Sequence, residues 1–384
     1  MSTLKVGAIR GTGASSDAIT VNATDGTCTV KATNNLSNRN LVINGAMKIA
    51  QRGDVTGVEY GYGGCDRWRF SGGSAARISM NQTTGPTAEG FAYCQEFDVT
   101  TADASLAAGD YNMLSYKWEG LDLQQIKKGT SAAESLTVSF WVSSPKTGTH
   151  ILELYDQANS RQISKAYTVS TADTWEKKTV TFAGDTTGTI ANTTANGLTL
   201  EFWLCAGSTY SGGTLNTSWA ALTNANRAVG QVNCMDNTSN NFKLTGVQVE
   251  IGEVATDFEH RSYGDELVKC YRYCFAKINP ADNQYASQFI GTYYNSSRIY
   301  GSIQFPVAMR SPPTCVCSDA TDAFHAYRDS GSDSVNEFNI DSANNVGLTA
   351  AEVLNDDDAS GTAGHSCFVR RDTPATAFRF EAEL

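Results

Sequence analysis

The sequence predicts an all-β fold: an antiparallel jelly-roll β-sandwich, a short linking helix and a smaller C-terminal β-sandwich. Apolar and polar residues alternate over short runs such as 136–142 and 198–204, and this period of two indicates strands buried on one face. Turns rich in Gly, Asn and Asp separate the runs. Hydrophobic residues are 41% of the 384 and charged residues 18%, which indicates a folded chain, since disordered chains carry more charge and fewer aromatics.

The first segment, residues 1–37, is predicted to serve attachment or oligomerisation. It has short β-like runs at 4–9, 18–23 and 27–32, but few large apolar residues. Such a segment buries too little surface to offset the entropy lost when it becomes ordered. We therefore expect it to pack against another copy of the chain or against other proteins of an assembly.

The central domain is predicted to span residues 38–262. In the runs 136–142 and 198–204, every second residue is large and apolar, so each run places one apolar face toward a core. The run 242–251 alternates in the same way, but Gly246 breaks its phase, as a β-bulge does. Many short antiparallel strands at this spacing are typical of a sandwich.

A linking helix is predicted over residues 263–277. Ser262 suits its N-cap and Asp265 lies three residues later, which is close to a capping box. Leu267 and Tyr271 lie on one helical stripe together with Cys274.

The residues that lead into this helix combine aromatic and charged side chains. We expect Phe258 and Tyr263 to be buried. We expect Glu259, His260 and Arg261 to form local charged hydrogen bonds that fix the direction in which the chain leaves the sandwich, rather than an active site, because adjacent residues rarely converge on one substrate.

The C-terminal domain is predicted to span residues 278–384, with strands in runs such as 287–294 and 377–384. This stretch has six Arg, no Lys and fourteen Asp or Glu, a net charge of −8 within a chain whose net charge is −11. Such charge repels a polyanion, so we expect no nucleic-acid partner. No apolar run approaches the ~20 residues that span a bilayer, and 1–11 lacks a signal-peptide core. We expect no membrane insertion, production in a cytoplasm and reduced cysteines.

Neither metal nor cofactor binding is predicted. Cys270 and Cys274 lie one helical turn apart, but a structural zinc ion needs four ligands, and only His260 is near in sequence. The acidic loop 355–360 lacks the spaced ligands of a calcium-binding EF-hand.

Catalytic motifs are likewise missing from the sequence. None of the four His lies in a nucleophile elbow, a metalloprotease helix or a P-loop. A glycosidase carboxylate pair is defined only in space, and nothing in the sequence indicates one. We therefore expect no catalytic residue and no enzyme activity.

Outward aromatic residues are the candidate ligand contacts. Trp141 and Trp203 lie opposite the apolar stripe of their strands, where an indole either packs under a loop or stacks on a planar ligand such as a sugar ring. Both alternatives stay open for each ring. The carbohydrate-binding candidates are Trp118, Trp203, Tyr210 and Trp219.

Several phrases resemble tail-fibre and related virion proteins of marine, cyanophage-like tailed bacteriophages. They are NRNLVINGAMKIAQRG, CDRWRF, SLTVSFWVSSPKTGTH, DTWEKKTVTFAGDTTGT, GLTLEFWLCAGSTY and FKLTGVQVEIGEVATDFEHRSYGDELVKCYRYC, within residues 1–275. The resemblance implies a jelly-roll domain similar to carbohydrate-binding modules, and a virion surface protein that is commonly a homotrimer. It defines no catalytic residues.

Two functions follow as hypotheses. In the first, the chain is a non-enzymatic tail fibre or receptor-binding protein. Its N-terminal segment contacts other virion proteins, and the particle, assembled in the host cytoplasm, attaches to host polysaccharide or lipopolysaccharide. The alternative is a structural virion component, such as a capsid decoration, head fibre or tail adaptor, without direct receptor binding. A depolymerase is the weakest of the ideas.

Overall fold

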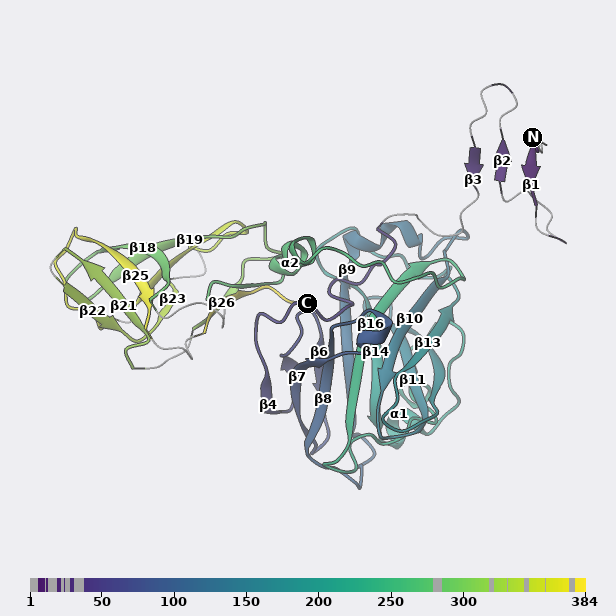
Figure 1. Ribbon diagram of the computed structural model, residues 1–384. Coiled ribbons are helices and arrows are strands. Elements are labelled where there is room, and N and C mark those ends of the chain that lie inside the picture. The colour runs from purple at the N-terminus through teal and green to yellow at the C-terminus, as the bar shows by residue number, and fades with distance from the viewer. Residues whose placement is uncertain are drawn as a thin grey trace.

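The computed structural model describes residues 6–10, 12, 19–21, 24, 28–30, 38–278, 285–317, 321–329, 331–341, 345–355, 357–372 and 377–384. The prediction of an all-β fold is confirmed, since strands account for nearly all of its regular structure (Figure 1). The helical elements are short: α1 (Ser208–Ser211), α2 (Tyr263–Tyr271) and the 3₁₀ turns η1 (Thr87–Glu89), η2 (Gly120–Ile126) and η3 (Asn224–Asn226). None of the helices in these ranges has the length and hydropathy of a membrane-spanning segment.

Two antiparallel sheets form the central sandwich. The first has the order β13-β10-β16-β8-β7-β4 and the second β15-β12-β11-β14-β9-β6-β5. The strands are β4 (Val55–Val58), β5 (Gly61–Tyr62), β6 (Arg69–Gly72), β7 (Arg77–Thr84), β8 (Tyr93–Thr101), β9 (Tyr111–Glu119), β10 (Leu136–Ser143), β11 (Gly148–Asp156), β12 (Arg161–Val169), β13 (Glu176–Phe182), β14 (Asn196–Ala206), β15 (Ala220–Ala221) and β16 (Asn241–Ile251).

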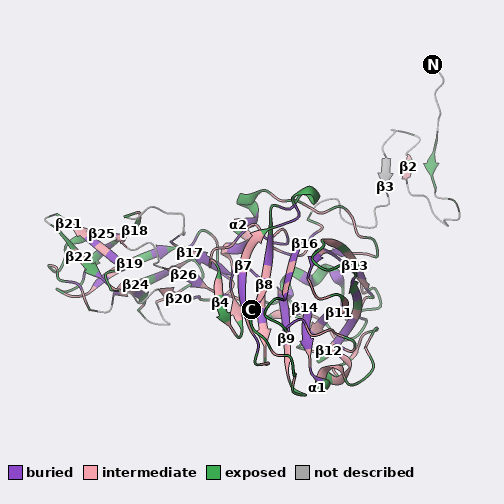
Figure 2. Cartoon of the chain, turned by 60° about the horizontal axis from the view of Figure 1, so that its bottom comes forward, coloured by how far each residue is buried: buried purple, intermediate pink, exposed green. Residues whose placement is uncertain are grey.

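The alternation in the sequence sets which side chains enter the core. Val138 and Phe140 of β10 and Leu200 and Phe202 of β14 are all buried between the sheets. In Figure 2 the colour of buried residues marks strands of the sandwich such as β14. The rings of Phe140 and Phe202 meet edge to face at 5.0 Å. Gly246 is the predicted bulge: the β10–β16 register shifts there, and its φ is +60°.

A second, distal unit follows helix α2. One sheet has the order β17-β26-β20 and the other β22-β21-β25-β18-β19-β24-β23. The strands are β17 (Cys274–Ala276), β18 (Ser287–Tyr293), β19 (Ile299–Gln304), β20 (Thr314–Cys317), β21 (Phe324–Arg328), β22 (Gly331–Val335), β23 (Phe338–Ile340), β24 (Ala350–Asn355), β25 (Ser366–Arg371) and β26 (Phe378–Glu381).

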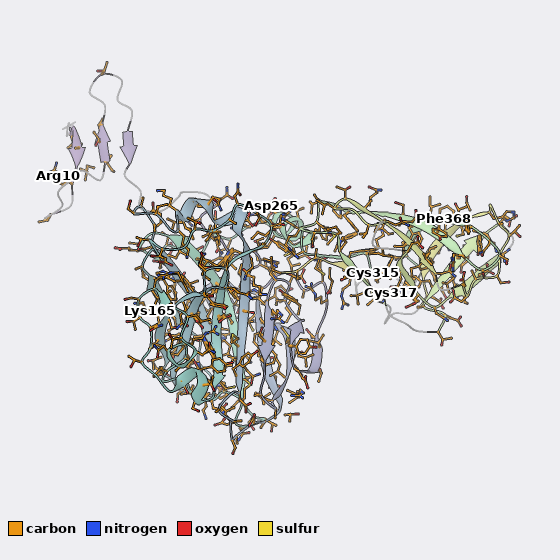
Figure 3. The ribbon with its side chains drawn as sticks, turned by 180° about the vertical axis from the view of Figure 1, so that it is seen from behind. Arg10, Lys165, Asp265, Cys315, Cys317 and Phe368 are labelled. Atoms are coloured by element: carbon orange, nitrogen blue, oxygen red, sulfur yellow. The ribbon has the colours of Figure 1, made fainter. Side chains whose placement is uncertain are left out.

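The distal unit has its own hydrophobic core. Phe289, Phe324 and Phe378 are among its buried aromatic residues. Cys315 and Cys317, labelled in Figure 3, both pack against this core, because residues two apart on a strand lie on the same face. The nine cysteines whose side chains are described are free thiols.

Helix α2 is shorter than the predicted range 263–277. It ends at Tyr271, and the next residues form strand β17, which pairs with β26. Phe275 of β17 packs parallel to Phe380 of β26, with the ring centroids 6.4 Å apart. Cys274, which the helical pattern assigns to the helix, therefore lies in a sheet. Pairing with β26 gives the backbone of residues 274–276 its hydrogen-bonding partners.

The last residues of the chain return to the sandwich. Figure 1 places the C end at the junction of the two units, beside α2 and β6. Glu383 pairs with Arg67 and, at 3.3 Å, with Arg52, while the carbonyl oxygen of Leu384 accepts a hydrogen bond of 3.0 Å from the Tyr62 hydroxyl. We call residues 381–384 the C-terminal clasp.

Most of the predicted attachment segment, 1–37, lies outside the described residues. Its described parts form a three-stranded antiparallel sheet of β1 (Ala8–Ile9), β2 (Ile19–Val21) and β3 (Cys28–Val30). Its binding to other chains stays a prediction.

Candidate functional site

Helix α2 joins the two units and forms a wall of two pockets. Tyr263, Leu267 and Tyr271 line one pocket, whereas Val268 and Lys269 line the other. Residues four apart share a side of a helix, so α2 presents a tyrosine-rich side to one pocket and a lysine to the other. The Ser262 hydroxyl accepts a 3.2 Å hydrogen bond from the Asp265 amide, which caps the helix as predicted.

The residues before the helix hold the chain against the segment 40–44. A Glu259 carboxylate oxygen accepts a 2.9 Å hydrogen bond from the Asn40 amide, and Arg261 Nη1 donates to the carbonyl of Val42 at 3.0 Å. These partners are 219 residues away. The expected hydrogen bonds therefore exist for Glu259 and Arg261; those to the segment 40–44 are long-range, and Arg261 also lies 3.5 Å from carboxylate oxygens of its neighbours Glu259 and Glu266. The His260 side chain forms no hydrogen bond within the described residues and packs against the rings of Phe91 and Phe258 instead.

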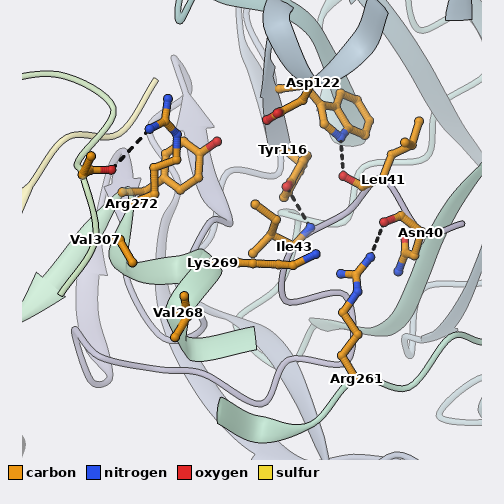
Figure 4. Close-up of a pocket in the computed structure, with 13 residues that line it drawn as sticks. Asn40, Leu41, Ile43, Tyr116, Asp122, Arg261, Val268, Lys269, Arg272 and Val307 are labelled. Atoms are coloured by element: carbon orange, nitrogen blue, oxygen red, sulfur yellow. Dashed lines mark hydrogen bonds between the residues drawn. The ribbon is translucent and has the colours of Figure 1, made fainter. Parts of the chain in front are cut away.

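The pocket lined by Val268 and Lys269 lies between the two units, and we call it the interdomain pocket. Its volume is about 440 Å³, within the range typical of small-molecule sites. Figure 4 shows the side chains that surround it. They are Asn40, Leu41, Ile43, Tyr116, Trp118, Asp122, Arg261, Val268, Lys269, Arg272, Tyr273, Val307 and Ala308.

The cations of the interdomain pocket differ in how they are paired. Arg272 forms two 2.6 Å hydrogen bonds with the carboxylate of Glu119, and Arg261 lies 3.5 Å from a Glu266 oxygen. The side chains of Lys269 and Asp122 form no hydrogen bond or ion pair with any residue that the structure describes. The pKa of Lys269 is lowered mainly by burial and, to a smaller extent, by the positive charge of Arg261. The pKa of Asp122 is raised mainly by burial and, to a smaller extent, by the negative charge of Glu119.

The pocket on the other side of α2 is rich in tyrosine, and we call it the tyrosine pocket. It encloses about 420 Å³, and Tyr93 and Tyr263 in its wall are 44% and 57% exposed. The prediction that Tyr263 is buried is therefore wrong, because the first turn of α2 projects it into this opening. Within the described residues, the hydroxyls of Tyr93, Tyr263 and Tyr271 bond to nothing. The pocket is lined by Lys48, Ile49, Ala50, Gln51, Gln82, Tyr93, Tyr263, Leu267, Tyr271 and Ala276.

A third hollow of about 300 Å³ lies on the outer face of the six-stranded sheet, and we call it the tryptophan pocket. Trp141 of β10 lies directly opposite Lys177 on one neighbouring strand and Thr245 on the other. The indole N–H of Trp141 has no acceptor among the described residues, and the side chain of Lys177 has no partner there. The pocket is lined by Glu89, Phe91, Ser139, Trp141, Lys177, Gly246, Asp257, Phe258 and His260.

The tryptophan and tyrosine pockets are neighbours. His260 lines the first and Lys48 the second, and the charge of Lys48, after the effect of burial, lowers the pKa of His260. Phe91 and Tyr93, two residues apart, likewise belong to one pocket each. Together the two pockets offer aromatic rings and unpaired polar groups along one flank of the sandwich.

The structure does not bring the four predicted carbohydrate contacts together. Trp118 is buried, and its N–H donates to the carbonyl of Leu41 at 2.8 Å, so it closes the floor of the interdomain pocket with little of its ring exposed. Trp203 is 0% exposed, and its N–H donates to Glu153 at 2.8 Å. Because a stacking contact needs an open ring face, this structure does not support Trp118 or Trp203 as ligand platforms.

Tyr210 and Trp219 are partly exposed but lie in other places. Tyr210 packs on Trp203 with ring centroids 5.5 Å apart. Trp219 donates to the carbonyl of Ala183 at 2.7 Å and has the Lys128 amine 5.2 Å from its ring centroid. Their role in glycan contact stays a prediction.

The aromatic residues of the neighbouring pockets were missed as a group. The sequence indicates that Trp141 points outward, since it lies opposite the apolar stripe of β10. Trp203 shows the same pattern on β14 but is covered by a loop, so this pattern does not distinguish an open ring from a covered one. Tyr93 and Tyr263 are the first residues of β8 and α2. They line the same pocket because of tertiary contacts, which no local sequence pattern reveals.

A carboxylate pair does occur on the outer face of the seven-stranded sheet. Glu153 and Glu201 are direct partners on β11 and β14, and Arg227 donates to both, at 2.9 and 2.6 Å. The Arg227 guanidinium lies between the rings of Tyr155 and Trp203, 4.8 and 5.1 Å from their centroids. Arg227 thus offsets one of the two negative charges and covers the pair.

The part of the chain that the structure describes contains no group of three or more His, Cys, Asp or Glu side chains arranged to hold a metal ion. Cys270 and Cys274 are both buried free thiols.

Comparison with known proteins gives structural likenesses only. No family model matches the chain, and no curated protein matches it. Among solved structures, a CBM4 carbohydrate-binding module is 12% identical with a TM-score of 0.30, and the match covers 55% of this chain and 99% of that one. A family 11 carbohydrate-binding module from Clostridium thermocellum is 14% identical with a TM-score of 0.28, covering 53% and 98%.

A phage protein is also among these structures. The enzymatically active domain of tailspike protein 4 from bacteriophage CBA120 is 10% identical with a TM-score of 0.28, covering 48% of this chain. The chain spans about a fifth of that structure's length (19%). All three TM-scores lie below 0.5, and the all-β sandwich assignment rests on the sheet order of the chain itself.

Proposed function

We propose that this chain is a non-enzymatic virion protein of a tailed bacteriophage, a tail fibre or receptor-binding protein that attaches the particle to glycans of the host surface. The supporting observation is the flank formed by the tyrosine and tryptophan pockets. There, Trp141, Tyr93 and Tyr263 combine with polar side chains that have no internal partner among the described residues.

Sugars suit such a flank for two chemical reasons. A pyranose ring presents C–H groups that pack on aromatic faces, and its hydroxyls need both donors and acceptors. The tryptophan pocket supplies donors from Trp141 and Lys177 and acceptors from Glu89 and Asp257. Volumes of about 300 and 420 Å³ accommodate one or two sugar units in each pocket.

Attachment by this route depends on several copies. Each pocket is open and small, so a single contact is weak. A homotrimer, held to other virion proteins through residues 1–37, would present several flanks together, and the second and third contacts would then form at a high effective concentration. The proposal places the protein on the phage particle after assembly in the host cytoplasm.

Retention of the purified chain on immobilised host polysaccharide or lipopolysaccharide tests this proposal. Trp141→Ala and Tyr263→Ala should each lower retention at least tenfold while leaving the thermal unfolding curve in place. Tyr60→Ala is the matched control, since Tyr60 is 65% exposed and lies outside these pockets. Unchanged retention in both variants would remove the flank as the glycan site, and release of oligosaccharide would contradict a non-enzymatic role.

The alternative, a structural virion component without receptor binding, is favoured by a different observation. Phe368 and Ile290 are cross-strand partners on β25 and β18 of the distal sheet, and they are 52% and 64% exposed. Figure 3 labels Phe368 in the distal unit. Shared apolar faces between copies would cover such residues. Imaging of particles with the protein labelled separates the two roles: label on the head supports the structural component, and label at fibre tips supports the adhesin.

A further inference from the structure

The interdomain pocket contains two opposite charges that the protein itself leaves unused. Lys269 and Asp122 both line it, and neither side chain has a hydrogen-bond or ion-pair partner within the described ranges. The other charges nearby are committed, since Arg272 is paired with Glu119 and Arg261 donates to backbone carbonyls of segment 40–42. Lys269 is half-buried, and a half-buried charge without a protein partner is costly unless a ligand or water satisfies it.

We propose that the interdomain pocket binds a carboxylate-bearing sugar unit, a hexuronic acid residue, with its carboxylate on the Lys269 amine and its ring hydroxyls on the Asp122 carboxylate. This site is separate from the tyrosine and tryptophan pockets, and it does not depend on their role in attachment.

The charge of the pocket selects the anion. One unpaired amine matches one negative charge, whereas the carboxylate of Asp122 in the same pocket repels a dianion such as a phosphate monoester. Asp122 instead suits neutral donors, because a carboxylate accepts hydrogen bonds from two neighbouring hydroxyls. The ligand that satisfies both groups carries one carboxylate and several hydroxyls.

The apolar walls and the rim fit the same ligand. Ile43, Val268 and Val307 line the pocket and would cover the C–H face of a pyranose. Val268 and Asp122 are exposed at the rim, so a glycan chain can continue outward from a bound unit. A free amino acid, which also carries both charges, needs no such opening.

The pocket draws its walls from both units, so a bound ligand would contact both. Val307 and Ala308 come from the distal unit, and Tyr116 and Asp122 from the sandwich. Figure 4 shows Lys269 extending from the helix beside Ile43 of the sandwich. A ligand that binds only the folded arrangement raises the unfolding temperature, and the gain grows with the logarithm of the ligand concentration relative to Kd.

The test is titration of the full chain with methyl glucuronide, methyl glucoside, acetate and alanine, followed by calorimetry and by the unfolding temperature. Methyl glucuronide should bind at least tenfold more tightly than the other three. Lys269→Gln should reduce glucuronide binding to the level of glucoside, and Asp122→Asn should weaken it as well. Lys127→Gln, at an exposed lysine outside the pocket, should leave it unchanged.

Three outcomes overturn the proposal: equal affinity for glucuronide and glucoside, tighter binding of alanine, or full glucuronide binding by a folded Lys269→Gln variant. Trp141→Ala separates this site from the attachment flank, because it should retain glucuronide binding. Loss of binding in Trp141→Ala together with full binding in Lys269→Gln would assign the ligand to the tryptophan pocket instead.

Discussion

Arg272, just after helix α2, and Glu119, at the end of strand β9, form a two-bonded ion pair with both N–O distances at 2.6 Å. The Glu119 side chain is fully buried and also accepts a 2.6 Å hydrogen bond from the Tyr273 hydroxyl. This pair fixes the joint between the two units, since its partners come from the sandwich and from the chain that leaves it.

Glu119→Ala should strongly destabilise the joint. It removes the buried partner of the pair, so Tyr273 loses its acceptor and Arg272 keeps only the carbonyl of Ala308, at 3.2 Å. Because the Arg272 side chain is 29% exposed, we expect a cost at the lower end for such pairs, about 3 kcal/mol. Chemical denaturation should show the loss in the free energy of unfolding. Glu134→Ala breaks the exposed pair with Lys127 and should cost less than about 1 kcal/mol. Equal effects of the two variants would show that Glu119 does not hold the joint.

The C-terminal clasp should hold the distal unit in a fixed position against the sandwich. Glu383→Gln removes the charge that Arg67 and Arg52 share, while Arg67 is buried and lies 3.4 Å from the Tyr273 ring centroid. We expect a loss of about 3 kcal/mol and a larger radius of gyration in small-angle scattering as the distal unit detaches. An unchanged scattering profile would mean that the clasp is dispensable for the arrangement.

Glu352→Gln is the control for the clasp variant. Glu352 lies on the exposed face of β24 in the distal unit, away from the joint. It should leave both the stability and the scattering profile within error of the unaltered protein.

His150 should make the sandwich sensitive to acid. Burial lowers the pKa of His150 to about 4, and its Nε2 lies 3.0 Å from the carbonyl oxygen of Lys146. A pKa of about 6.5 in the unfolded chain means that the unfolded state takes up a proton first. The stabilising contribution is therefore complete above pH 6.5 and is lost between about pH 6.5 and 4, by about 3 kcal/mol.

The measurement is the free energy of unfolding against pH in His150→Gln, whose amide can still donate to Lys146. Its curve should be flatter than that of the unaltered protein between pH 6.5 and 4. His365→Gln, at an exposed position, should keep the original slope. Parallel curves for all three proteins would contradict the assignment to His150.

Glu201 should have the opposite pH dependence. Burial, and then the neighbouring carboxylate of Glu153, raise the pKa of Glu201 above its ordinary 4.5. The folded state holds the proton more tightly than the unfolded chain, so this contribution is present below about pH 4.5 and is lost as pH rises toward the folded pKa. Glu201→Gln should thus gain stability relative to the unaltered protein at pH 9 and not at pH 5. A constant difference at both pH values would exclude proton binding at this pair.

The sequence by itself determined the fold class and the core. The alternation of Val138 and Phe140, or of Leu200 and Phe202, fixes which face of each strand is apolar, and the phase break at Gly246 fixes a bulge, because these patterns depend only on neighbours in the chain. Ser262 and Asp265 set the start of the helix for the same reason.

Only the tertiary structure decided which outward side chains meet. Trp141 and Trp203 carry the same signal on β10 and β14, but a loop with Tyr210 and Arg227 covers Trp203, while Trp141 stays in a pocket. Lys269 and Asp122 are 147 positions apart, and the helix that links the two units brings them into one cavity. Whether an outward ring or charge is covered depends on what distant chain packs over it, which no local periodicity encodes.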